Sequence, residues 1–131
     1  MEAAQSPGSQ PIRILLADDH RLFAEALAAI LEGDARLEIV GRARNGQEAI
    51  ELARSLVPDV VVMDANMPVM DGVEATEEIT RALPNVRVLM LTAQKLTADI
   101  DRAHRAGAAG YVTKDRVASE LIEAIVDLGV P

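Results

Sequence analysis

Five short apolar runs, rich in β-branched residues, recur along this chain with starts that lie 23 to 26 residues apart. The runs are Ile12–Ala17, Leu37–Gly41, Val60–Met63, Val86–Leu91 and Gly110–Val112. Each interval leaves room for one helix and two loops, which is the rhythm of repeated strand–helix units. Such units, joined by right-handed crossovers, build an open parallel sheet with helices on both faces. The spacing therefore predicts an α/β fold with a doubly wound, five-stranded parallel sheet.

Helical signals fill the intervals between these runs. Asn45 followed by Glu48 is typical of a capping box at the start of a second helix, which stops before Pro58. Asp71 is predicted to cap a third helix. The first helix is predicted to end at Gly33 and to turn to the sheet an apolar face made of Leu22, Phe23, Ala26, Leu27, Ile30 and Leu31. The fifth helix has an apolar face made of Val117, Leu121, Ile122 and Ile125.

The fourth helix, predicted at about residues 96–106, differs from the others. Its apolar stripe is narrow, consisting of Leu96, Ile100 and Ala103 among charged residues, and Gly107 ends it. Because packing of an apolar face supplies most of the stability of a helix in a protein, we expect this helix to be the most weakly packed of the five.

Composition excludes several classes of site. The chain has no cysteine, which excludes disulfides, thiolate zinc sites, iron–sulfur clusters and thiol nucleophiles. Phe23 and Tyr111 are its only aromatic residues, so a flavin pocket or a stacking groove for single-stranded nucleic acid is disfavoured. The net charge of −8 disfavours direct binding of nucleic acid and favours binding of cations.

The length of 131 residues fits one domain. Residues 1–11 are polar and contain Pro, Gly and Ser, so we expect a disordered leader. We expect residues 12–128 to form the domain, and residues 129–131 to be the start of a linker or a truncated C-terminus. No apolar run approaches the ~20 residues of a membrane span, and no signal pattern begins the chain. These features predict a cytoplasmic protein with no membrane partner.

Polar side chains follow four of the predicted strands. Asp18 and Asp19 come after the first strand, Asp64 after the third, Thr92 after the fourth and Lys114 after the fifth. The carboxyl ends of parallel strands meet at one edge of the sheet, which is where doubly wound sheets bind their ligands. With strand order 2-1-3-4-5 the first and third strands are neighbours, so the three aspartates converge.

Three carboxylates in one crevice repel each other unless a cation lies among them. Hard oxygen ligands with open positions suit Mg²⁺ or Mn²⁺. A divalent ion beside a carboxylate, with a lysine opposite and a hydroxyl nearby, forms a phosphoryl-transfer site in which the carboxylate is the nucleophile. Nearby polar residues have plainer interpretations: His20 as a surface residue that opens the first helix, His104 as an exposed residue of the fourth, and Asp71 as a cap rather than a metal ligand.

Four stretches carry a resemblance to a known family: Ile14–His20 (ILLADDH), Met63–Gly72 (MDANMPVMDG), Leu91–Ala93 (LTA) and Gly110–Asp115 (GYVTKD). In this order and at these spacings they make residues 12–128 resemble a response-regulator receiver domain of two-component signalling. The chain is especially similar to the receivers of LuxR/NarL-type transcriptional regulators. The resemblance implies a flavodoxin-like (βα)5 receiver fold with strand order 2-1-3-4-5.

The same resemblance implies a role for each residue of the acidic cluster. Asp64 accepts the phosphoryl group. Asp19 and Asp64 bind Mg²⁺ (or Mn²⁺) directly, and Asp18 binds it mainly through water. The backbone carbonyl of Asn66 completes the set of protein ligands.

The resemblance also implies roles for residues in and after the last two strands, which respond to phosphorylation. Lys114 pairs with the phosphoryl oxygens, Thr92 moves to form a hydrogen bond with the phosphate, and Tyr111 changes rotamer with it. This couples the site to the face made by the fourth helix, the fifth strand and the fifth helix. Asp115 stands where many receivers have proline, so the Lys114–Asp115 bond is open to either the cis or the trans form.

The implied phosphoryl donor is a sensor histidine kinase. The domain then catalyses only its own phosphorylation and dephosphorylation, and is not an enzyme acting on a separate substrate. The resemblance is compatible with a homodimer formed on phosphorylation, and it implies that DNA is bound only through a C-terminal domain outside this sequence.

Three other interpretations remain open from the residues. A stand-alone receiver would act through protein contacts alone. A haloacid-dehalogenase-like phosphatase needs a second carboxylate two residues after the nucleophile, where this chain has Asn66, and a cap domain, for which 131 residues leave no room. A flavodoxin-like carrier needs a first loop rich in Ser, Thr or Gly, where this chain has Asp18 and Asp19.

Overall fold

The structure is a computed structural model that describes residues 10–93 and 97–129. Its centre is a single five-stranded sheet in the order β2-β1-β3-β4-β5, and each neighbouring pair of strands is parallel. The strands are β1 (Ile12–Ala17), β2 (Leu37–Ala43), β3 (Val60–Asp64), β4 (Arg87–Thr92) and β5 (Gly110–Thr113). The predicted fold class and strand order are confirmed.

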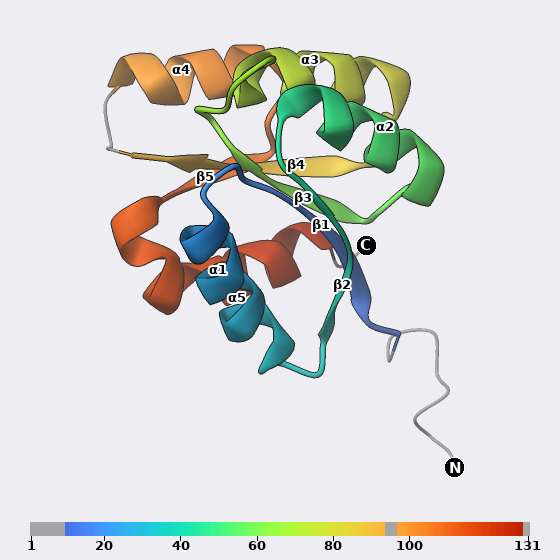
Figure 1. Cartoon of the computed structure of the whole chain (residues 1–131), viewed down its shortest axis with the longest axis vertical. Coiled ribbons are helices and arrows are strands. Elements are labelled where there is room, and N and C mark those ends of the chain that lie inside the picture. The colour runs from blue at the N-terminus through green and yellow to red at the C-terminus, as the bar shows by residue number, and fades with distance from the viewer. Residues whose placement is uncertain (1–9, 94–96, 130–131) are drawn as a thin grey trace.

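Helices cover both faces of the sheet (Figure 1). One face carries α1 (Arg21–Glu32) and α5 (Val117–Gly129), and the other carries α2 (Gly46–Leu56), α3 (Gly72–Ala82) and α4 (Thr97–Arg105). Each layer has its own aliphatic core against the sheet, because successive strand residues point to opposite faces. The sheet itself is therefore buried on both sides, and all five residues of the central strand β3 are buried.

The predicted helix ends agree with the cap geometry. The side chain of Asn45 accepts a hydrogen bond from the Glu48 N–H at 2.9 Å, and the Asp71 carboxylate accepts one from the Glu74 N–H at 2.9 Å. Both bonds satisfy amide groups that have no partner within the helix. Gly33 follows the last residue of α1, as expected.

The predicted apolar face of α1 is partly wrong. Leu22 is 82% exposed and Ala26 is also exposed, whereas Ala28, which the pattern omitted, is buried. The buried stripe follows Phe23, Leu27 and Leu31 at intervals of four residues, so Leu22 lies on its flank. Strand ends also differ slightly: β2 runs two residues further than predicted, and β4 begins one residue later.

Several predictions fall wholly or partly outside the described residues. These are the leader at residues 1–9, the end of the chain at residues 130–131, and Leu96 of the fourth-helix stripe. Among the α4 side chains that the structure describes, only Ala103 is fully buried, which fits the expected weak packing. In the described residues the Lys114–Asp115 bond is trans, and no helix is long and apolar enough to span a bilayer.

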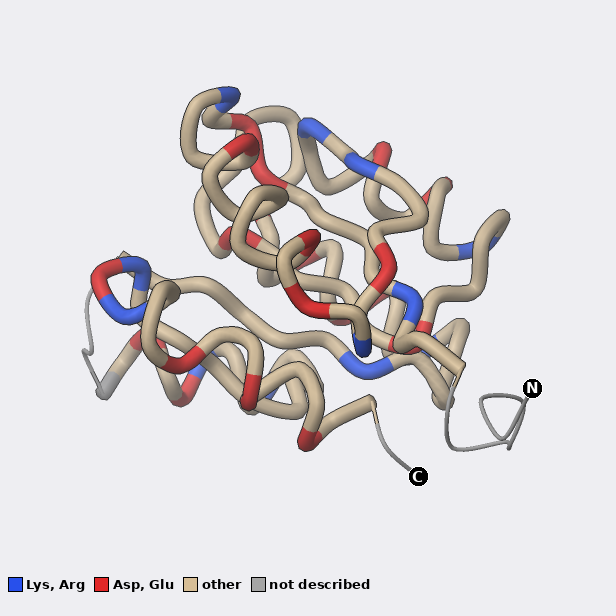
Figure 2. Tube along the Cα trace, turned by 90° about the horizontal axis from the view of Figure 1, so that it is seen from below, with Lys and Arg blue, Asp and Glu red and all other residues tan. Residues whose placement is uncertain are grey.

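Charge is spread over the molecule. Figure 2 shows Asp and Glu on both layers of helices, with fewer Lys and Arg between them. The 21 acidic residues outnumber the 13 basic ones, so the protein has an overall negative field.

Candidate functional site

The strand register brings the predicted polar residues to one edge of the sheet. Ala17 pairs with Met63 across β1 and β3, so Asp18 and Asp64 are the next residues on these neighbouring strands. On the other side, Thr92 pairs with Thr113 across β4 and β5, which puts Lys114 one residue beyond this pair. The predicted convergence at the carboxyl ends of the strands therefore follows from the topology.

Asp64 is completely buried and both of its carboxylate oxygens accept hydrogen bonds. Its Oδ1 accepts a bond from the Asn66 N–H at 3.1 Å, and its Oδ2 accepts one from the Lys114 Nζ at 3.1 Å. The ammonium of Lys114 also lies 5.3 Å from the centre of the Phe23 ring on α1. A salt bridge with one buried partner and an aromatic contact hold the lysine over the carboxylate.

Asp18 is also buried, but its carboxylate is only half satisfied. Its Oδ1 accepts a hydrogen bond from the His20 N–H at 2.7 Å, whereas its Oδ2 has no partner in the described part of the chain. Burial raises the pKa of Asp18, opposed by the bond from His20 and reinforced by the nearby charge of Asp64. Asp19, the third member of the cluster, remains partly exposed, with 29% of its side chain accessible.

His20 is both exposed and close to the acidic cluster. Its side chain is 67% exposed, as a surface residue should be. Its Nδ1 nevertheless lies 3.5 Å from Asp19 Oδ1, 3.7 Å from Asp18 Oδ1 and 4.0 Å from Asp64 Oδ2. One donor atom from each of these four residues lies within 4.8 Å of every other.

This arrangement fits a divalent cation. Three carboxylates within a few ångströms of one another, two of them buried, repel each other in the absence of a counter-charge. The buried Oδ2 of Asp18 lacks a donor among the described residues, and a metal ion is a natural partner for such an oxygen. The donor set, mostly oxygen, is of the kind that Mg²⁺ prefers.

Thr92 and Tyr111 are not part of this cluster. Thr92 ends β4, is 2% exposed, and its Oγ1 has no hydrogen-bond partner among the described residues. Tyr111 is half-buried on β5, and its ring meets the ring of the exposed His104 edge to face, with centroids 6.5 Å apart. Tyr111 therefore belongs to the contact between α4 and β5.

Two glycines, Gly46 and Gly72, allow close backbone contacts around the loop after β3. A Cβ on Gly72 would overlap the backbone carbonyl of Asp64, and one on Gly46 would overlap the carbonyl of Met70. The Gly72 N–H also bonds to the Ala65 carbonyl at 3.0 Å. Only glycine allows α3 to begin this close to Asp64. A glycine directly after a helix cap is the sequence signal that could have indicated such an approach.

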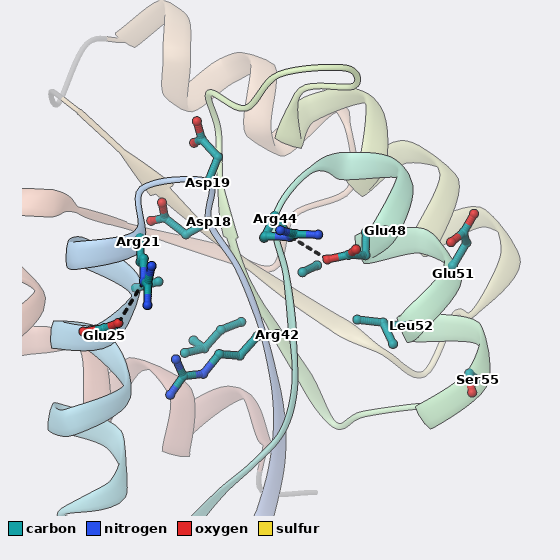
Figure 3. Close-up of a pocket in the computed structure, with 13 residues that line it drawn as sticks. Asp18, Asp19, Arg21, Glu25, Arg42, Arg44, Glu48, Glu51, Leu52 and Ser55 are labelled. Carbon is teal, nitrogen blue, oxygen red and sulfur yellow. Dashed lines mark hydrogen bonds and ion pairs between the residues drawn. The ribbon is translucent and has the colours of Figure 1, made fainter.

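A groove of about 890 Å³ opens from the cluster between α1 and α2 (Figure 3). Asp18 and Asp19 lie at one end of it, and Arg42, Arg44 and Glu48 line its middle. The groove follows the edge strand β2 away from Lys114, so it meets the acidic cluster at one end only.

Known proteins are similar to this chain in sequence and in fold. Residues 14–126 match the response regulator receiver domain family. Transcriptional regulatory protein LnrK of Bacillus subtilis is 46% identical over 115 residues, which are 88% of this chain and 52% of LnrK. The chain spans about half the length of the curated relatives it matches.

Solved structures agree. The signal receiver domain of NarL from Mycobacterium tuberculosis has a TM-score of 0.85 at 34% identity, with 90% of this chain and 95% of that one covered. A LuxR-family two-component response regulator from Aurantimonas has a TM-score of 0.85 at 36% identity, with 90% and 84% covered. The predicted likeness to LuxR/NarL-type receivers is confirmed. This chain belongs to the response regulator receiver domain family of two-component signalling.

Proposed function

We propose that this chain is a phosphorylation switch in which a sensor histidine kinase donates a phosphoryl group to Asp64. The single observation that carries this proposal is the pairing of Lys114 Nζ with a fully buried Asp64 carboxylate at 3.1 Å, beside two further aspartates. A buried nucleophile with a fixed cation at one side and a cation-attracting cluster at the other suits phosphoryl transfer.

The transfer is a single displacement. A carboxylate oxygen of Asp64 attacks the phosphorus of a phosphohistidine, a P–O bond forms, and the P–N bond breaks. The electron pair of that bond stays on the leaving imidazole nitrogen, which takes a proton from solvent. Lys114 pairs with the phosphoryl oxygens as charge develops on them, because its ammonium already lies within 3.1 Å of the attacking group.

Asp18, Asp19 and Asp64, with the backbone carbonyl of Asn66, are the residues that would hold Mg²⁺ (or Mn²⁺) in this site. When bound, the ion neutralises charge on the phosphoryl oxygens and on the carboxylates. The protein's own part is to hold these oxygens in one place through the turn from Asp18 to His20 and the bond from the Asn66 N–H.

The unpaired hydroxyl of Thr92 is the group that would respond to a phosphoryl group on Asp64, by donating a hydrogen bond to it. Movement of Thr92 frees space at the end of β4 for Tyr111 to change rotamer, which alters its contact with His104 on α4. The α4–β5–α5 face then differs between the two states. The weak packing of α4 keeps the energy difference between its positions small.

We assign residues 12–128 to the receiver and place its reaction in the cytoplasm, with transcription as the process controlled. The relatives that support this are named transcriptional regulatory proteins, and the matched region spans about half of their length. DNA would be bound by a C-terminal domain outside this sequence, with a homodimer formed on phosphorylation. The domain would catalyse only its own phosphorylation and dephosphorylation.

Labelling by acetyl phosphate and Mg²⁺ tests the assignment of Asp64. We expect intact-protein mass spectrometry to detect one added phosphoryl group on the wild type and none on Asp64→Asn. Asp71→Asn is the matched control, because it changes an aspartate of the same loop that caps α3, and asparagine caps helices equally well. Undiminished labelling of Asp64→Asn would refute the proposal.

A further inference from the structure

We propose that His20 is a fourth protein ligand at the divalent-cation site and gives this site affinity for ions that prefer imidazole, such as Co²⁺, Ni²⁺ and Zn²⁺. The inference rests on the proposed function for the location of the cation site. It adds a residue and an ion class to that site.

The contacts of His20 have the spacing of ligands around one ion rather than of hydrogen bonds. Its Nδ1 lies 3.5, 3.7 and 4.0 Å from carboxylate oxygens of Asp19, Asp18 and Asp64. The two longer separations exceed the range of hydrogen bonds. Two ligands that each lie about 2.1 Å from a tetrahedral metal ion are about 3.4 Å apart. The four donor atoms all lie within 4.8 Å of one another, close enough to be ligands of a single ion.

The second carboxylate oxygen of Asp18 independently indicates that this cluster lacks a partner. The Asp18 side chain is 1% exposed, and its Oδ2 has no hydrogen-bond partner among the described residues. Lys114 pairs with Asp64 alone, so within the described ranges Asp18 and Asp19 have no lysine or arginine in an ion pair. A buried carboxylate without a partner is costly unless a cation binds to it.

The local backbone holds the imidazole in this position. His20 is the residue before the first turn of α1, and its N–H donates to Asp18 Oδ1 at 2.7 Å. This bond ties the residue to one of the acids that its ring approaches. Because 67% of the side chain stays accessible, an ion reaches the Nδ1 from solvent without opening the core.

The chemistry of imidazole predicts which ions benefit. Mg²⁺ prefers oxygen ligands and keeps several waters, so it gains little from His20. Co²⁺, Ni²⁺ and Zn²⁺ bind imidazole readily and follow the Irving–Williams order.

Titration with Co²⁺ at one fixed neutral pH tests the inference, followed by its visible absorption and by calorimetry. We expect His20→Ala and His20→Ser to bind Co²⁺ about tenfold or more weakly than the wild type and to lose the nitrogen-ligand absorption. Serine is included because it caps helices well, which protects the start of α1. Mg²⁺ affinity should change by no more than about twofold in both variants, which also shows that the acidic site remains folded.

His104→Ala is the matched control, since His104 is the only other histidine and lies on α4 against Tyr111. Unchanged Co²⁺ binding in the two His20 variants, or an equal loss in His104→Ala, would overturn the inference. Labelling of wild-type Asp64 with Mg²⁺ is measured separately. If labelling succeeds while the His20 variants bind Co²⁺ as tightly as the wild type, the inference alone is wrong. If labelling fails while Co²⁺ binding depends on His20, the proposed function is wrong and the metal ligand stands.

Discussion

Val57 follows the last turn of α2 with φ 45° and ψ 65°, in the left-handed region that side chains with a Cβ avoid. Its N–H still bonds to the Ala53 carbonyl, and the guanidinium of Arg13 donates to the carbonyls of Leu56 and Val57 at 2.9 and 3.0 Å. These bonds hold the helix end in place although a β-branched residue is strained there.

Val57→Gly is expected to stabilise the protein by about 0.5–1 kcal/mol. The left-handed conformation costs roughly 1–2 kcal/mol for a residue with a Cβ, and glycine removes this strain. Part of the stabilisation is offset because glycine also raises the conformational entropy of the unfolded chain. Val57→Ala keeps the Cβ, so it should gain much less. Urea unfolding measures both, as midpoints with an unchanged slope. A lower midpoint for the glycine variant would show that the valine side chain, half exposed at 51%, contributes more by packing than it costs by strain.

The positions of some residues in the site could be predicted from the sequence, whereas others could not. Asp18, Asp19, Asp64 and Lys114 were placed together correctly, because the ends of parallel strands must share one edge. The sequence left the position of the His20 ring open, since the ring direction depends on side-chain torsions that no periodic pattern reveals. Side-chain rotamers of exposed residues are set by local contacts, which spacing alone does not encode.

At the scale of elements, a cluster of three charged side chains links the turn after α1 to α5. The Arg36 guanidinium donates to Asp34 Oδ2 at 2.8 Å and to Glu123 Oε2 on α5 at 2.9 Å. Asp34 Oδ1 also accepts the backbone N–H of Arg36 at 2.9 Å. The hydrogen bonds from Arg36 lower the pKa of Asp34 to about 2, from an ordinary value of 3.8.

This lowered pKa makes the link dependent on pH. The ionised carboxylate of Asp34 is favoured in the folded state, so its contribution to stability is fully present above 3.8 and is lost as the pH falls through about 2. We expect Asp34→Asn to be less stable than the wild type in urea at neutral pH, and the difference to vanish towards pH 2. Glu38→Gln removes an exposed acid with no ion pair in the described chain and controls for net charge. A difference that persists at low pH would assign the effect to the turn geometry.

The helices differ in how well their sequences predicted them. Caps at Asn45 and Asp71 were recognised because a cap is a contact between residues three apart in the chain. The predicted face of α1 was wrong at Leu22 because the buried stripe runs through Phe23, Leu27 and Leu31, which leaves Leu22 on its exposed flank. The weak packing of α4 could be predicted because a helix with few apolar residues has little surface to bury against the sheet.

At the scale of the whole molecule, the fold concentrates negative charge at one edge of a protein that is already acidic. The net charge is −8, and two of the three clustered aspartates are buried at the ends of adjacent strands. The aliphatic cores on the two faces of the sheet stabilise the chain, whereas repulsion among these carboxylates opposes folding. The proposed function therefore requires carboxylates that lower the stability of the folded chain.

The substitution Asp18→Asn tests how the charge of Asp18 affects stability with and without a bound cation. Because burial raises the pKa of Asp18, its charge destabilises the folded state at neutral pH, and this penalty declines as the pH falls. An asparagine keeps an oxygen to accept the His20 N–H and removes the charge, so the variant should unfold at a higher urea concentration than the wild type in EDTA. With Mg²⁺ at a hundred times its Kd, the wild type should gain about 2.7 kcal/mol and the variant clearly less. Asp71→Asn, outside the cluster, should follow the wild type in both conditions. A variant less stable than the wild type in EDTA would mean that the unpaired oxygen of Asp18 is satisfied without a metal, and the electrostatic account of this edge would be wrong.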